Sequence, residues 1–179
     1  MPSPITRVPR IHVCGVPELD ASLKRRFSHI VSIWDPEWIE RGGVEDELRR
    51  RIFEKTRLHV AYFHDVSTEE TGRIAPVEDD LRRILDFTRE LEADSEILVH
   101  CWAGISRSTA VAYAILCQAT GPERERECIE AVIAARPQAF PNSLIVELCD
   151  KILERRGAMR RACDEMLSEI FSGLGRRSN

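Results

Sequence analysis

One segment, Ile97 to Gln118, constrains the fold of this chain more than any other. It opens with an apolar run, Ile97–Val99, continues through HCWAGISRS at positions 100–108, and ends in a helical pattern of small apolar residues from Ser108 to Gln118. A short apolar run that passes through a glycine-containing loop into an apolar helix is typical of a central strand covered on both faces. Cys101 is therefore expected where a buried strand ends and a helix begins.

Hydrophobic periodicity predicts further strands that alternate with helices. The expected strands are Ile11–Cys14, Ile30–Trp34, Leu58–Phe63 and Ile97–Cys101. The expected helices are Asp46–Glu54, Val77–Leu91, Ser108–Gln118 and Glu123–Arg136, followed by a helical region that Asn142 opens and Gly157 divides. This alternation implies an α/β fold with a mostly parallel central sheet of about four to five strands flanked by helices. Ligands of such sheets bind beyond the carboxyl ends of the strands, which is where Cys101 falls.

The length of 179 residues predicts a single domain. We expect its core at about residues 10–155, a C-terminal helical extension at 156–173 and a frayed tail at 174–179. An apolar stripe runs through the C-terminal region from Leu144 to Phe171. We expect this stripe to pack on the domain, and a homodimer face is the alternative.

Composition and charge exclude several classes of protein. A net charge of −4 and the lack of a basic stripe interleaved with aromatic residues argue against a nucleic-acid partner. No apolar run of about 18 residues is present, so no membrane span is expected, and the N-terminal residues show no signal-peptide pattern. The six cysteines fall mostly in strand or helix patterns, which favours free thiols and a reducing, cytoplasmic location.

The residue types at positions 100–108 suit the binding and transfer of a phosphoryl group. Main-chain N–H groups of a strand-to-helix loop, together with the helix dipole, favour a dianionic oxyanion. The same field stabilises a thiolate at Cys101. Arg107 adds a planar fork of donors that matches two phosphate oxygens. His100 and Cys101 are adjacent and would face opposite sides of a strand, so we expect no metal site, and the pattern calls for no cofactor.

Three motifs resemble those of the cysteine-based protein tyrosine phosphatases, and more specifically their small dual-specificity-like branch. HCWAGISRS is similar to the phosphate loop of that family, RPQAFPN at 136–142 to the segment before its next helix, and YFHD at 62–65 to the strand end that carries its aspartate. The resemblance covers about residues 28–153 and implies a phosphatase-like fold. It also implies hydrolysis of phosphate monoesters in proteins, with phosphotyrosine as the first candidate and phosphoserine and phosphothreonine as further ones.

On chemical grounds, Cys101 is the expected nucleophile and forms a cysteinyl-phosphate intermediate, while Arg107 neutralises charge on the phosphoryl oxygens. Ser108 is placed to donate to the thiolate as it leaves, and an ordinary serine of an early helical turn is the alternative. The resemblance implies that His100 steadies the loop. The N–H groups that would hold the phosphate belong to Trp102, Ala103, Gly104, Ile105, Ser106 and Arg107.

Asp65 is the expected general acid. It follows the strand Leu58–Phe63 and begins an irregular polar stretch that can carry it over a bound phosphate. A turn-forming aspartate is the alternative. The rivals for the acid role are Glu69, Glu70 and Asp79.

Three further residues have two interpretations each. The resemblance implies that Asn142 braces the phosphate loop, and a helix N-cap is the competing interpretation. His64 is expected on the surface at a strand end, with tuning of Asp65 as the alternative. Trp102, which is bulky for its place after the cysteine, either packs under the loop or forms the rim of the pocket.

The loop also bears on the substrate. In the family that the loop resembles, members that act on phosphoinositides have lysines at its variable positions. This loop has none at 102, 103, 105 and 106, so the resemblance implies a singly phosphorylated substrate. Phosphate, sulfate and vanadate are the expected ligands. A module that binds phosphorylated proteins without cleaving them and a rhodanese-like sulfurtransferase are the two alternatives. The presence of Cys101, Arg107 and Asp65 together argues against the first, and the His-Cys…Arg-Ser pattern argues against the second.

Overall fold

The computed structural model describes residues 8–68 and 70–175. Its centre is a four-stranded sheet in the order β1-β4-β2-β3, in which every pair of neighbouring strands is parallel. The strands are β1 (Arg10–Gly15), β2 (His29–Trp34), β3 (Arg57–Tyr62) and β4 (Glu96–Cys101). The α/β class and the four predicted strands are therefore confirmed. β4 lies between β1 and β2, so the strand that ends in Cys101 is central.

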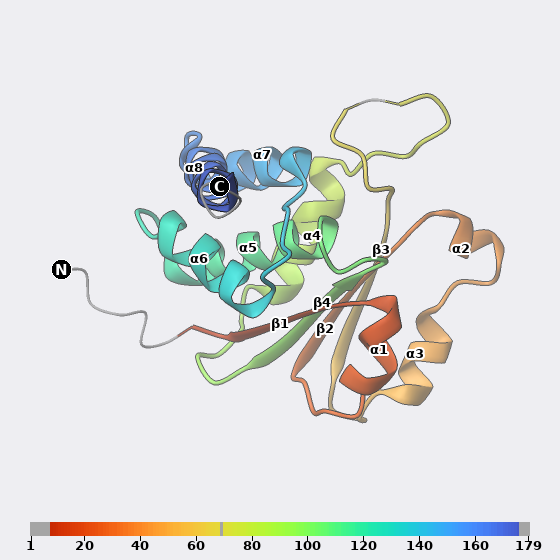
Figure 1. Cartoon of the computed structure of the whole chain (residues 1–179). Helices are drawn as coiled ribbons and strands as arrows, with labels where there is room; N and C mark the ends of the chain where they lie inside the picture. Colours follow the sequence, from red (N-terminus) through yellow and green to blue (C-terminus); the bar gives the residue numbers. More distant parts are fainter. Residues whose placement is uncertain (1–7, 69, 176–179) are drawn as a thin grey trace.

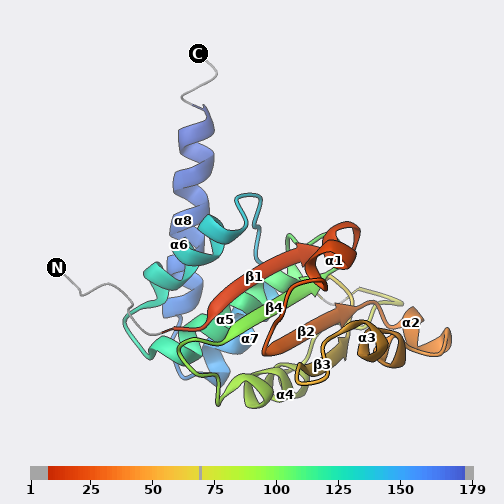
Figure 2. The same ribbon diagram turned by 90° about the horizontal axis from the view of Figure 1, so that it is seen from below.

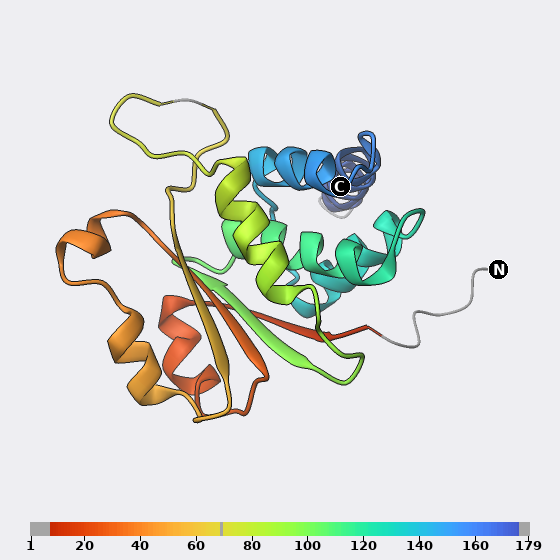
Figure 3. The ribbon, with the colours of Figure 1, turned by 180° about the vertical axis from the view of Figure 1, so that it is seen from behind.

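Five helices lie on one side of the sheet (Figures 1 and 3). They are α4 (Glu78–Thr88), α5 (Arg107–Thr120), α6 (Glu125–Ala135), α7 (Ser143–Ile152) and α8 (Ala158–Gly175). Three of them, α4, α5 and α6, lie against the strands, and the other two lie against these helices. α5 is buried at every position from Arg107 to Cys117, as its small apolar residues predict. A helix buried on all sides is held rigidly, so the loop that precedes it has a fixed end.

The other face is covered by α1 (Val16–Ser22) and α3 (Glu45–Arg51), and the short α2 (Glu37–Glu40) follows the end of β2 (Figure 1). α3 corresponds to the predicted helix Asp46–Glu54, but it ends three residues earlier. α1 and α2 were not predicted from the sequence. Each is too short to repeat an apolar position: α1 buries Leu19 alone, and α2 buries no residue. Periodicity carries no signal for a helix of this length.

The C-terminal region divides at Gly157, as predicted. Gly157 has a φ of +83°, and the Asp150 carboxylate accepts the N–H groups of Gly157 and Met159 at 2.6 and 2.8 Å, which turns the chain from α7 into α8. α8 packs along α6 and α7, and its last turns extend away from the body (Figure 2). It continues to Gly175, so the helix includes positions 174 and 175, which we had expected to be part of a frayed tail. Residues 176–179 of that expected tail lie outside the described residues.

Two other properties concern the whole described chain. All six cysteines are free, buried thiols. No helix of the described residues combines the length and the apolar character that a bilayer crossing requires.

The end of β1 packs closely against the loop that follows β4. The Val16 N–H donates to the Trp102 carbonyl at 2.9 Å, and a methyl group added to Gly15 would lie 2.8 Å from the main chain of Ala103. Gly104 of the loop has a φ of +68°, and a methyl group there would lie 2.4 Å from the main chain at Cys14 and Gly15. The two glycines therefore allow two stretches of backbone to approach each other more closely than side chains permit.

We predict that Gly15→Ala lowers the free energy of unfolding by about 1–3 kcal/mol, because main-chain atoms must move to admit the methyl group. Urea unfolding of the variant and of the unchanged protein measures the difference. Gly121→Ala is the comparison: its added methyl group would meet no atom within 4 Å, so it measures only the cost of a positive φ (+81°), which Gly15 (φ −94°) does not have. A Gly15→Ala variant as stable as the unchanged protein would contradict the prediction.

Candidate active site

The structure places the predicted nucleophile at the carboxyl edge of the sheet. Cys101 is the last residue of β4, and its side chain is 1% exposed. Its Sγ lies 3.1 Å from the hydroxyl of Ser108, in the first turn of α5. Ser108 is itself fully buried, so this contact excludes water. The predicted partnership of Cys101 and Ser108 therefore has the geometry of a hydrogen bond.

Arg107 opens α5 and is anchored along one edge of its guanidinium. Nη1 donates to the Asp35 carboxylate at 2.8 Å and to the Phe63 carbonyl at 2.7 Å. The side chain is 3% exposed, and its Nε has no hydrogen-bond partner within the described structure. The edge formed by Nε and Nη2 is therefore the one left to bind two oxygens of an oxyanion. An orphaned buried donor of this kind marks a site built for a ligand.

Asp65 lies at the rim of the loop between β4 and α5. The structure therefore brings Asp65, which follows β3, close to Arg107, which follows β4. Its Oδ1 accepts hydrogen bonds from the Ser106 hydroxyl at 2.7 Å and from Asn142 Nδ2 at 2.9 Å. Its Oδ2 lies 4.0 Å from Arg107 Nε. Asp65 is thus held at the base of its loop by two hydrogen bonds, whereas we had expected a free loop to carry it.

Of the three rivals to Asp65, Asp79 lies in the first turn of α4, where its exposed carboxylate pairs with Arg83 at 2.7 Å. Glu70 lies in the exposed loop between β3 and α4. Glu69 lies outside the described residues.

Asn142 serves two elements at once. Its Oδ1 accepts the N–H of Ile145 at 3.1 Å, which confirms the N-cap of α7. Its Nδ2 donates to Asp65 and to the Val66 carbonyl, so the side chain braces the segment that carries the aspartate. Contact with the phosphate loop comes instead from the main chain, where the Asn142 N–H donates to the Ser106 carbonyl at 3.3 Å.

His100 lies fully buried beneath the loop. Its Nε2 is 2.6 Å from the Ser32 hydroxyl, which in turn accepts a hydrogen bond from the Trp34 indole at 2.6 Å. Because the Ser32 oxygen already accepts from Trp34, its own hydrogen is available to Nε2. Burial lowers the pKa of His100 from 6.5 to about 4. The ring is therefore neutral near pH 7 and supports the loop as an uncharged group.

Several residues of the site carried no sequence signal that we used. Arg136, known only as part of a motif, donates from Nε to the Gly104 carbonyl at 3.0 Å and from Nη1 to the Glu18 carboxylate at 2.7 Å. Glu18 also accepts the Gly15 N–H at 2.8 Å, and hydrogen bonding to Arg136 holds the pKa of Glu18 below its usual value. Asp35 directly follows β2 just as Asp65 closely follows β3, and that shared position is the signal that could have identified it.

The two open interpretations of Trp102 and His64 are decided by burial. Trp102 is 54% exposed, so it forms part of the rim and does not pack under the loop. His64 is buried at 3% exposure, so its expected surface position is wrong. His64 lies two residues after the end of β3, and its Nε2 is 2.9 Å from the Glu37 carboxylate of α2.

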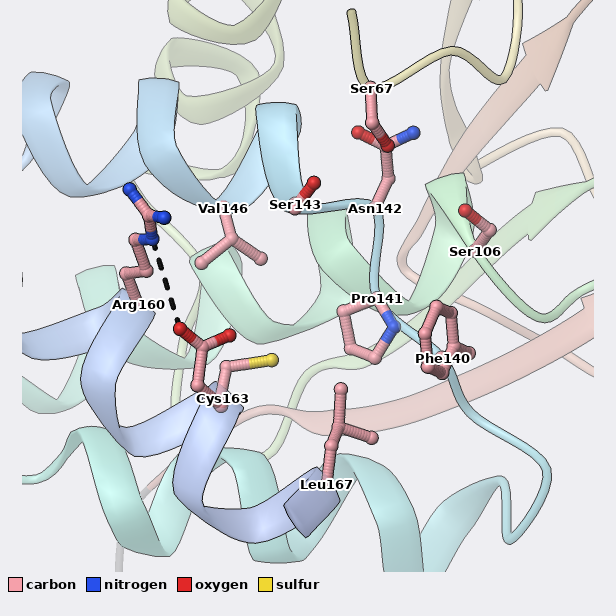
Figure 4. A pocket seen from close by; sticks show the side chains of 11 residues that line it. Ser67, Ser106, Phe140, Pro141, Asn142, Ser143, Val146, Arg160, Cys163 and Leu167 are labelled. Atoms are coloured by element: carbon pink, nitrogen blue, oxygen red, sulfur yellow. Dashed lines mark ion pairs between the residues drawn. The ribbon is translucent and has the colours of Figure 1, made fainter. Parts of the chain in front are cut away.

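A separate cavity of about 180 Å³ lies between the loop and the C-terminal helices (Figure 4). Ser106 and Asn142 stand at one end, and Arg160, Cys163 and Leu167 of α8 form the other. Cys101 and Arg107 are not among its lining residues, so this cavity is not the anion site.

The buried neutral His100 predicts a dependence of stability on pH. Between pH 6.5 and about 4 the unfolded chain binds a proton at His100 that the folded protein does not. The free energy of unfolding therefore decreases as the pH falls through this window, by about 3 kcal/mol when complete. Urea unfolding at several pH values measures the slope, which we expect to be shallower in His100→Asn than in His59→Asn. An NMR titration of the His100 ring with a midpoint near 6.5 would contradict this.

Comparison with known proteins shows which proteins this chain resembles in sequence. No protein-family model matches the chain. Dual specificity protein phosphatase 15 of Mus musculus is 35% identical over 146 residues, which are 80% of this chain and 61% of the mouse protein. The protein of the same name from Rattus norvegicus is 36% identical over the same share. The chain thus spans about three fifths of the length of the curated relatives it matches.

Solved structures of phosphatases share the fold. The alignment with Tk-PTP has a TM-score of 0.56 at 23% identity, and it covers 86% of this chain and 99% of Tk-PTP. DUSP15 has a TM-score of 0.54 at 20% identity, over 88% of this chain and 92% of its own. The resemblance that the motifs indicate is therefore confirmed: the chain has the fold of the cysteine-based protein tyrosine phosphatases and is similar in sequence to their dual-specificity branch.

Proposed function

We propose that this protein hydrolyses phosphate monoesters in phosphorylated proteins, with Cys101 as the nucleophile. One observation carries the proposal: a buried thiol, a guanidinium anchored along one edge and a hydrogen-bonded aspartate converge on the loop between β4 and α5. The curated relatives are named dual specificity protein phosphatases, which supports the same chemistry. The alternatives, a non-catalytic binding module and a sulfurtransferase, do not require all three groups together.

In the first step, the Cys101 thiolate attacks phosphorus, a sulfur–phosphorus bond forms and the ester oxygen–phosphorus bond breaks. The N–H groups of residues 102–107 and the Nε–Nη2 edge of Arg107 hold the three non-bridging oxygens. Because Asp35 and the Phe63 carbonyl fix the other edge, the guanidinium needs no reorientation as charge develops. Uncatalysed hydrolysis of phosphate monoesters is among the slowest biological reactions, so this pre-placed charge must supply much of the acceleration.

The leaving oxygen requires a proton, and Asp65 supplies it. Its Oδ1 is occupied by Ser106 and Asn142, so Oδ2 is the oxygen free to carry a proton. In the second step Asp65 takes a proton from the water that attacks the cysteinyl phosphate. The Ser108 hydroxyl, 3.1 Å from Sγ, then stabilises the thiolate as the sulfur–phosphorus bond breaks.

Phosphotyrosine is the first candidate substrate, and phosphoserine and phosphothreonine come next. The phosphate loop offers no lysine for additional phosphate groups. A structurally similar protein, PTPMT1, has been solved in complex with PI(5)P, so a phosphoinositide belongs among the substrates to be assayed. Phosphate, sulfate and vanadate would occupy the loop as substrate-like anions. We also expect a cytoplasmic location. A homodimer through the C-terminal helical region is the alternative to the expected packing of that region on the domain.

We predict that Cys101→Ser reduces turnover of para-nitrophenyl phosphate to background, because the hydroxyl is not ionised near pH 7. Arg107→Lys replaces a two-donor fork by a single ammonium and should lower kcat by about 10²–10³-fold. Steady-state kinetics and vanadate inhibition measure both effects. Persistent turnover in Cys101→Ser would contradict the covalent mechanism.

Phosphopeptide binding without turnover by the unchanged protein would favour the binding module, and a positive thiocyanate-forming assay would favour the sulfurtransferase.

Asp65→Asn tests the general acid. We expect kcat to fall by about 10²–10⁴-fold with phosphotyrosine peptides and the acidic-to-neutral pH profile to flatten. The loss should be smaller with para-nitrophenyl phosphate, because its leaving group needs less protonation.

Asp35→Asn is the matched control, because Asp35 also contacts Arg107. It should lower the rate without changing the shape of the pH profile. The reverse pattern would assign the acid role to Asp35.

A further inference from the structure

We infer that a recess beside the phosphate loop binds an anionic side chain of the substrate, near the phosphorylated residue in the peptide. This inference rests on the proposed function and adds a substrate preference to it. The recess has a volume of about 320 Å³. Its lining combines two tryptophans with oppositely charged residues: Trp38, Trp102, Asp35, Glu37, Arg41 and Arg73.

The recess adjoins the loop that would hold the substrate phosphate. Trp102 directly follows Cys101, and Asp35 bonds to Arg107. Arg73 comes from the loop that Asp65 begins. A peptide whose phosphate is bound by the loop therefore extends either over this recess or over the opposite side of the loop.

The carboxylates that line the recess already have partners. Asp35 is bonded to Arg107 at 2.8 Å. Glu37 accepts hydrogen bonds from His64 Nε2 at 2.9 and 3.1 Å. The charge of Asp35 is therefore matched by Arg107, whereas Glu37 keeps a negative charge that attracts the nearby Arg73.

The recess holds two arginines against one carboxylate, Glu37, that is not paired with Arg107. Arg41 lies over the Trp38 ring at 5.3 Å, and among the described residues neither Arg41 nor Arg73 has a carboxylate within 4.0 Å. Both side chains belong to exposed residues. The surplus charge that the recess presents to a ligand is therefore positive, which favours a carboxylate or a second phosphate on the substrate.

The loop that carries Arg73 is fixed at its neck. The His64 N–H donates to the Ile74 carbonyl at 2.8 Å, and the Ile74 N–H donates back to His64 Nδ1 at 2.8 Å. Since Nδ1 accepts, Nε2 carries the hydrogen that points to the Glu37 carboxylate. The residue next to Arg73 is thus tied to the wall of the recess, so little ordering of the backbone is needed on binding.

The two tryptophans suit the apolar stem of a glutamate side chain. Trp102 is half-exposed at the rim, and Trp38 stacks edge-to-face on the buried Trp34 at 4.9 Å. A side chain with methylene groups and a terminal anion can cover these rings and reach an arginine.

The test uses phosphotyrosine peptides with glutamate, glutamine, lysine or phosphoserine at the two positions on either side, and para-nitrophenyl phosphate as a substrate that cannot reach the recess. With the unchanged protein we expect kcat/KM to be higher for glutamate than for glutamine by about two- to fivefold per arginine engaged, and to fall with added salt. Arg41→Gln/Arg73→Gln should remove this preference and leave turnover of para-nitrophenyl phosphate unchanged.

Arg83→Gln, an exposed arginine on α4 paired with Asp79, is the matched control and should keep the preference. Equal kcat/KM for all flanking residues, or a glutamate preference that survives in the double variant, would overturn the inference. A preference for phosphoserine alone would replace the carboxylate by a second phosphate as the natural anion. Loss of para-nitrophenyl phosphate turnover in the unchanged protein would instead count against the proposed function, so the two failures are distinguishable.

Discussion

The ion pair of Arg107 with Asp35, reinforced by the Phe63 carbonyl, is the contact on which the site depends. It joins residues that follow three neighbouring strands, β2, β3 and β4, at their carboxyl ends. A guanidinium that is 3% exposed has lost its hydration, so it needs such partners to offset the free-energy cost of burying its charge. The same partners select which edge of the guanidinium faces the ligand. Folding and the orientation of the anion site are therefore governed by one set of bonds.

The loop itself is supported from two directions. On one side, Gly15 lets β1 approach the loop, and Arg136 holds the Gly104 carbonyl while Glu18 holds Arg136. On the other side, the Ser106 hydroxyl and Asn142 both reach Asp65. Loop carbonyls that are bonded outward leave the N–H groups pointing inward, which is the arrangement an oxyanion requires. These contacts thus orient the loop backbone for binding an oxyanion without themselves contacting a substrate.

The segment between β3 and α4 contributes both Asp65 and one side of the recess beside the loop. Asp65 lies at the base of a loop whose neck His64 and Ile74 close, and Glu37 of α2 holds His64 from outside. Asp65 and Arg73 are the neighbours of His64 and Ile74 within this loop, so the neck holds the backbone beside both of them. The segment between β3 and α4 can therefore position the Asp65 carboxylate beside Arg107 and place Arg73 in the lining of the recess at the same time.

The sequence by itself determined the parallel sheet, the buried α5 and the place of Cys101 at a strand end, because hydrophobic periodicity and the loop pattern are local along the chain. It also placed Asp65 near that edge, since the carboxyl ends of parallel strands meet there, whereas Asn142 was assigned to the loop only through the family resemblance. Only the tertiary structure decided which carboxylate pairs with Arg107, why His64 is buried, and how Glu18 reaches Arg136 across 118 positions. These contacts join segments far apart in the chain, and their energies depend on burial and on distances between side chains, which no local pattern contains.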